Sequence, residues 1–138
     1  MSSNPGPAIT TGVPLQNLSS NQAIRLIGKA ISVNVGAVGD TAIQTIDTSS
    51  FSVAYVVVTN ASASLAQAYC ALYTLPSAGG TAIVAAAALS SLSASAKVMS
   101  MTVASTDNPG VTKLYFRCTT ANTAAATCDV YVYGYDFS

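Results

Sequence analysis

Short runs of alternating hydrophobic and polar residues recur along the chain after residue 22. Alternation with a period of two places successive side chains on opposite faces of an extended strand. The run at 128–137 is the clearest, since Tyr131, Tyr133 and Tyr135 occupy every second position. The pattern therefore predicts β-strands that each bury one face.

Turn residues separate these runs, as in the Asp-Asn-Pro-Gly sequence at 107–110, where proline presets φ and glycine accepts a positive φ. Residues 85–96 are ambiguous, because alanine favours a helix and serine does not, and we expect a loop or one helical turn there. The predicted strands are 31–35, 41–46, 51–60, 65–74, 81–86, 97–103, 111–119 and 128–137.

Three of these strands carry specific expectations. Ile31, Val33 and Val35 should share one face of the first strand. The dense β-branched residues of 51–60 indicate a central strand that is covered on both faces. In the strand 111–119, the residues Leu114, Phe116 and Cys118 should point inward, and the face with Lys113, Tyr115 and Arg117 should be ordinary surface or a subunit contact.

Eight or nine short strands without a long helix are typical of an all-β sandwich or barrel. A chain of 138 residues suits a single domain. We therefore expect an all-β fold, a jelly-roll-like or Greek-key β-sandwich of about eight strands, over residues 23–138.

Residues 1–22 differ from the rest because they are uncharged and hold three of the five prolines. Proline lacks a backbone donor and fixes φ, so this segment cannot form a helix or a central strand. We expect an extended N-terminal arm that lies against its own body, a sister subunit or another protein. The arm residues expected to contact a partner are Pro5, Pro7, Ile9, Val13, Pro14 and Leu15.

The composition indicates a surface that is meant to be covered. Charged residues make up 7% of the chain, against a usual share of about 25%, and the net charge is zero. Alanine, serine and threonine together account for 57 residues. Since zero net charge promotes association, we expect much of this surface to lie in contacts.

The same composition argues against several functions. The chain has neither His nor Glu, the usual carriers of acid–base and metal chemistry, so we expect no enzyme activity, no cofactor and no metal site. Five basic residues are too few for nucleic acid, and no apolar run approaches the roughly 20 residues of a membrane helix. The N-terminus does not resemble a secretory signal, so synthesis in a cytoplasm is expected.

The three cysteines show no metal-binding spacing. They are interpreted as small buried hydrophobic residues. Cys118 and Cys128 would face each other if the last two strands formed a hairpin, so a disulfide between them stays open.

Tyr131, Tyr133 and Tyr135 form the most specific feature. Tyrosine is enriched at interfaces, because it offers a large amphipathic surface at low side-chain entropy. The stripe is interpreted as a partner interface, with a face covered by the chain itself or a sugar-stacking platform as alternatives. Arg25 and Lys29 lie where the arm meets the body, either paired with acidic groups of a partner or solvated at a strand end.

Several stretches resemble small head proteins of tailed bacteriophages, in particular capsid decoration (cement) proteins with β-sandwich folds. They are VVVTNAS at 56–62, ALYT at 71–74, GGTAIV at 79–84 and AAATCDVYVYG at 124–134. The resemblance covers about residues 30–136 and leaves the arm out. It implies that the arm lies across the major capsid protein.

These observations predict a non-enzymatic virion structural protein on the capsid exterior that bridges major capsid proteins and stabilises the shell. A homo-oligomer is expected, with a trimer preferred to a dimer because it matches the threefold positions of a capsid lattice. The alternative is a head-fibre or tail adhesin domain that binds host surface glycan.

Overall fold

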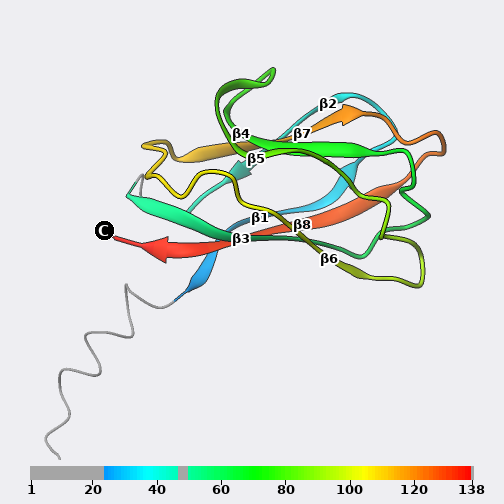
Figure 1. Cartoon of the computed structure of the whole chain (residues 1–138), viewed down its shortest axis with the longest axis horizontal. Coiled ribbons are helices and arrows are strands. Elements are labelled where there is room, and N and C mark those ends of the chain that lie inside the picture. The colour runs from blue at the N-terminus through cyan, green and yellow to red at the C-terminus, as the bar shows by residue number, and fades with distance from the viewer. Residues whose placement is uncertain (1–23, 47–49, 138) are drawn as a thin grey trace, which may run out of the picture.

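The computed structural model describes residues 24–46 and 50–137, which form eight strands and no helix (Figure 1). The strands are β1 (Arg25–Asn34), β2 (Gly39–Gln44), β3 (Phe51–Thr59), β4 (Tyr69–Leu75), β5 (Gly79–Ala88), β6 (Val98–Met101), β7 (Lys113–Thr120) and β8 (Thr127–Asp136).

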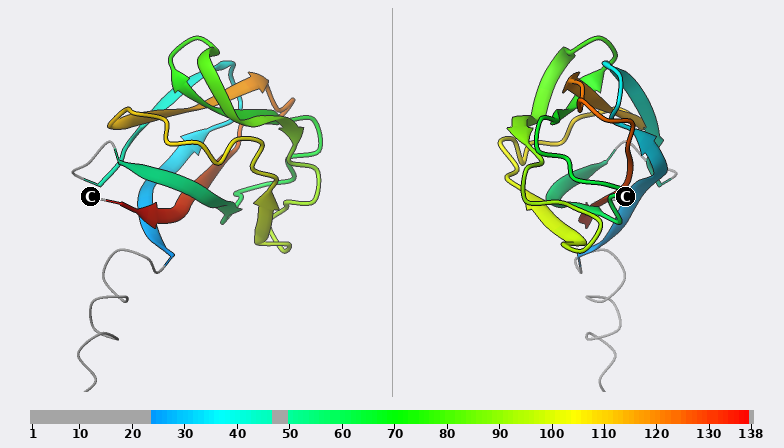
Figure 2. Two further views of the ribbon diagram at one scale, coloured as in Figure 1. Left: turned by 60° about the vertical axis from the view of Figure 1, so that its left-hand side comes forward. Right: turned by 90° about the vertical axis from the view of Figure 1, so that its right-hand side faces the viewer.

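The strands form two four-stranded antiparallel sheets, in the orders β1-β8-β3-β6 and β2-β7-β4-β5. Figure 1 shows the sheets as two layers, and the turned views of Figure 2 show them curving around a shared interior. The pairs β1·β8, β2·β7, β3·β6 and β4·β5 are nested, as in one long hairpin folded over itself. This is the jelly-roll arrangement, and the predicted all-β sandwich is confirmed.

The core lies between the two sheets, where alternate side chains of every strand meet. In β7, Leu114, Phe116 and Cys118 are buried, which confirms the prediction that these side chains point inward. Full burial of one large apolar side chain contributes about 2–3 kcal/mol. The largest fully buried side chains include Phe51, Phe116, Ile27, Ile43, Leu65 and Leu72.

Strand β5 is longer than the alternation predicted. It runs to Ala88 through alanines that were expected to form a loop or a helical turn. Pairing with β4 explains the difference, because Ala87 lies opposite Cys70 and Ala88 opposite Tyr69. Cross-strand pairing in the folded protein therefore overrides the helix preference of alanine.

Strand β6 is shorter than predicted, since it ends at Met101. Three residues later the backbone has reached the other sheet, where the Ala104 N–H donates to the Ile83 carbonyl at 2.7 Å. The chain leaves one layer for the other here, so the alternation beyond Met101 does not belong to a paired strand.

The predicted common face of Ile31, Val33 and Val35 is wrong. Strand β1 has an irregularity between Ala30 and Val33, and Ser32 has a φ of 56°. Ile31 is therefore 53% exposed, whereas Val33 and Val35 are buried. A bulge of this kind breaks the period of two, and the sequence contains no glycine to mark it.

Asp129 holds this bulge in place. Its carboxylate accepts a hydrogen bond from the Ser32 N–H at 2.9 Å and one from the Asn60 side-chain amide at 3.3 Å. Asn60 also has a positive φ, of 55°, and Asp129 is 9% exposed. One buried carboxylate thus stabilises two backbone positions that non-glycine residues seldom adopt.

We expect Asp129→Ala to lower the free energy of unfolding by about 2 kcal/mol, because the Ser32 N–H loses its charged acceptor. Urea denaturation measures the change. Ser32→Gly is the control and should stay within about 0.5 kcal/mol of wild type, since glycine adopts a positive φ readily. Equal urea midpoints for Asp129→Ala and wild type would show that the hydrogen bonds of Asp129 do not stabilise the protein.

The cysteines are arranged differently from the hairpin considered above. Strands β7 and β8 lie in different sheets, so Cys118 is not across a hairpin from Cys128. The residue opposite Cys118 is Cys70 in β4, and all three cysteines are free and buried. The interpretation as small buried hydrophobic residues is confirmed, and the disulfide is not formed.

Candidate functional site: the outer face of the β1-β8-β3-β6 sheet

The outer face of the β1-β8-β3-β6 sheet brings the predicted tyrosines together. In β8, Tyr131, Tyr133 and Tyr135 are half-buried and alternate with the buried residues Val130 and Val132. All three therefore point away from the core on the same side of one strand. Because β8 pairs with both β1 and β3, the tyrosines lie in the middle of the sheet.

The neighbouring strands widen this surface. Tyr133 lies between Leu26 of β1 and Tyr55 of β3 in the strand register. Directly paired residues of adjacent strands share a face, with Cβ atoms about 5 Å apart. We call this surface the tyrosine face and define it by Leu26, Lys29, Tyr55, Val57, Tyr131, Tyr133 and Tyr135.

Tyr55 is the most exposed aromatic member among those that the sequence did not single out. It was included in a strand expected to be covered on both faces, yet it is 54% exposed. That prediction is wrong for the outer side of β3, where no described residue covers Tyr55 fully. A lone tyrosine within a run of valines was the available signal.

Charge is sparse on the tyrosine face. Lys29 lies opposite Tyr131. Asp129 is buried, and its carboxylate is hydrogen-bonded to the bulge in β1. At one end of β8, Arg25 forms an ion pair with Asp136 at 3.2 Å, so Arg25 has an acidic partner within its own chain. Beside it, Tyr135 stacks on Phe137 with ring centroids 6.4 Å apart.

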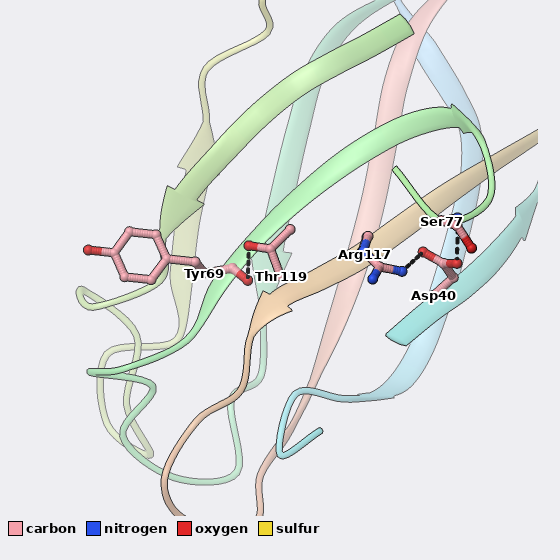
Figure 3. Close-up of polar contacts among 5 residues, drawn as sticks. All are labelled: Asp40, Tyr69, Ser77, Arg117 and Thr119. Carbon is pink, nitrogen blue, oxygen red and sulfur yellow. Dashed lines mark hydrogen bonds and ion pairs between the residues drawn. The ribbon is translucent and has the colours of Figure 1, made fainter. Parts of the chain in front are cut away.

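The outer face of the other sheet carries several polar contacts between strands (Figure 3). There Asp40 pairs with Arg117 at 3.1 Å and accepts the Ser77 N–H at 2.9 Å. The Thr119 hydroxyl donates to the Tyr69 carbonyl at 3.1 Å. These contacts cross-link β2, β7 and β4 through groups that water also solvates well. Of the two outer faces, the tyrosine face is therefore the better suited to a dry contact.

The buried thiols are unsuited to nucleophilic chemistry. Burial, together with the charge of the neighbouring Asp129 carboxylate, raises the pKa of Cys128 to about 12. Burial also raises the pKa of Cys70 and of Cys118. Because only the thiolate is a good nucleophile or metal ligand, these side chains behave as small apolar groups at neutral pH.

No cluster of three or more Cys or Asp side chains suited to a metal ion occurs in residues 24–46 and 50–137. None of the described residues belongs to a helix that is long and apolar enough to cross a membrane.

The predicted arm contacts at Pro5, Pro7, Ile9, Val13, Pro14 and Leu15 lie outside the described residues. The structure therefore leaves them as predictions. Comparisons of the chain with known protein families, with characterised proteins and with solved structures find no match.

Proposed function

We propose that this protein is a non-enzymatic decoration protein on the exterior of a phage capsid, and that its tyrosine face is the surface that contacts the major capsid protein. Attachment would bridge neighbouring capsid subunits and strengthen the shell, with arm residues 1–22 as a second contact. The resemblance to decoration proteins suggests the setting, and the described surface suggests the mode of contact.

The observation that carries the proposal is an exposed, aromatic and nearly uncharged sheet face on a chain that is poor in charge. Tyr55 is 54% exposed and Leu26 37% exposed, and both flank Tyr133. Large exposed apolar patches mark interaction sites, and tyrosine is among the side chains that dominate binding energy. A surface of this kind is better suited to a protein partner than to water.

The energetics are consistent with stable attachment. Removal of about 400 Å² of apolar surface from water contributes on the order of 10 kcal/mol. Association costs about 4–15 kcal/mol in lost freedom, so one face alone gives a modest affinity. Repetition of the contact over a shell, or a second contact through the arm, adds avidity.

The adhesin alternative makes a different use of the same face. It requires the tyrosines to stay accessible on the particle so that a host glycan can stack on them. The decoration proposal requires them to be covered on the particle.

We expect the double variant Tyr131→Ala/Tyr133→Ala to bind capsids about 100-fold more weakly, because truncation of a central interface tyrosine costs about 1–2 kcal/mol. The measurement is co-sedimentation with heads assembled from the major capsid protein of the same genome. Circular dichroism verifies that the variant is folded.

The matched control is Tyr69→Ala/Tyr115→Ala, which removes two tyrosines from the outer face of the other sheet. It should bind heads as wild type does. Equal binding by both double variants, or no binding of heads by wild type, would contradict the proposal.

A further inference from the structure

A second feature lies in the β2-β7-β4-β5 sheet, where β4 ends and β7 begins. Two cavities lie there, a smaller one of about 210 Å³ and a shallow one of about 420 Å³ that is largely open to solvent. Both are lined by Thr74 and by the connection between β6 and β7, which approaches the start of β7 at the left of Figure 1. We call the two together the Thr74 groove.

The smaller cavity is lined by groups that form hydrogen bonds with hydroxyls. Asp107 lies on it beside Asn108, Ser105 and Thr81. Among the carboxylates of the described residues, those of Asp40, Asp129 and Asp136 take part in hydrogen bonds or ion pairs. Asp107 has no such partner in the described part of the chain. Its two carboxylate oxygens are thus available to a ligand.

Asn108 and Thr74 each have hydrogen-bond donors that no described residue accepts. The Asn108 side-chain oxygen accepts the Gly110 N–H at 3.1 Å, which leaves its amide N–H groups as donors. The Thr74 hydroxyl oxygen accepts the Thr81 N–H at 2.9 Å, and no described group accepts its hydrogen. Thr74 is only 7% exposed, so this donor has little access to bulk water.

Gly80 is required for this arrangement. Its φ is 67°, and a Cβ atom there would overlap the Thr74 hydroxyl. Glycine at this position therefore leaves room for the hydroxyl of Thr74, a residue that lines both cavities.

The larger cavity adds apolar surface. Tyr115 alternates with the buried residues Leu114 and Phe116, so its ring lies on the outer side of the sheet. Leu75 and Val111 line the same cavity, together with Lys113. The groove thus combines an aromatic and apolar part with a polar part, and its one carboxylate is offset by one ammonium group.

We propose that the Thr74 groove binds a neutral sugar residue of a surface glycan. A pyranose ring has one C–H face, which packs on an aromatic ring, and a rim of hydroxyls, which pair with carboxylate, amide and hydroxyl groups. The balance of Asp107 and Lys113 favours a neutral ring over an acidic or amino sugar. This inference goes beyond the proposed function, because the groove lies in the other sheet from the tyrosine face.

The test is an NMR titration of the ¹⁵N-labelled protein with the methyl glycosides of glucose, galactose, mannose and N-acetylglucosamine. We expect saturable shifts at Thr81, Asn108 and Tyr115 with at least one glycoside, at a Kd of roughly 1–10 mM. Asp107→Ala and Tyr115→Ala should each weaken that binding about tenfold or more, and their spectra verify the fold.

Tyr131→Ala/Tyr133→Ala is the control and should bind the glycoside unchanged. The inference is overturned if none of the four glycosides gives saturable shifts, or if Asp107→Ala binds as wild type does. Tighter binding of methyl glucuronide than of methyl glucoside would overturn the assignment to a neutral sugar. Capsid binding is measured separately, so either proposal can fail without the other.

Discussion

Gly134→Ala is expected to destabilise the protein by about 3 kcal/mol or more, a large part of the 5–15 kcal/mol typical of a folded domain. Gly134 lies in the middle of the β1-β8-β3-β6 sheet, opposite Val53 of β3. A Cβ atom there would overlap the carbonyl group of Ser52 and lie 3.1 Å from the Cα atom of Val53. These are backbone atoms, so no side-chain rotation relieves the clash.

Thermal denaturation should show a midpoint about 10 °C lower for Gly134→Ala. Gly39→Ala is the matched control, since a Cβ atom at this other strand glycine meets no atom within 4 Å. It should keep or slightly raise the midpoint, because alanine reduces the entropy of the unfolded chain. Equal midpoints for the two variants would mean that β3 and β8 do not approach each other as described.

The three thiols are expected to be almost unreactive toward an aromatic disulfide reagent at pH 8 in the folded protein, and all to react in denaturant. Burial holds the pKa of Cys128 at about 12, and raises those of Cys70 and Cys118. The thiolate fraction in the native state is therefore very small, and the reagent has no access to the core. Rapid reaction of one thiol without denaturant would contradict this arrangement.

The same shifts predict a loss of stability at alkaline pH. In the unfolded chain Cys128 ionises near its ordinary pKa of 9.0, whereas the native thiol stays protonated up to about pH 12. Between these values the unfolded state binds fewer protons, so stability falls as the pH rises. The contribution of Cys128 to the free energy of unfolding is therefore complete below pH 9. Above pH 9 this contribution declines by about 1.4 kcal/mol per pH unit.

Urea midpoints at about pH 8 and pH 10.5 measure this loss in wild type and in Cys128→Ala. The variant should lose roughly 2 kcal/mol less between the two pH values, since it lacks one buried thiol that ionises on unfolding. Lysine and tyrosine titrations are common to both proteins and cancel in the comparison. An equal loss in both would show that Cys128 is not held protonated by the fold.

The candidate site could be predicted from the sequence only in part. The period of two in 128–137 was sufficient to place Tyr131, Tyr133 and Tyr135 on one face. It carried no information about the neighbours of that strand, so Leu26 and Tyr55 were missing from the prediction. Cross-strand neighbours depend on register, which is decided by contacts between segments distant in the chain.

The Thr74 groove could not be predicted from the sequence either. The sequence marked 107–110 as a turn, which accounts for its residue types by backbone preferences alone. Only the folded chain brings that turn beside Thr74 at the end of β4 and beside Tyr115 in β7.

By itself, the sequence determined the all-β class, the inward and outward sides of β7 and β8, and the low charge of the surface. These properties follow from local alternation and composition, which act on residues close together in the chain. Only the tertiary structure decided which strands share a sheet, and hence that Cys118 lies opposite Cys70 and that Ala87 and Ala88 extend β5 beyond the predicted strand. The nested pairing of a jelly roll joins the first strand to the last, and no local pattern encodes the partner of a strand so far away.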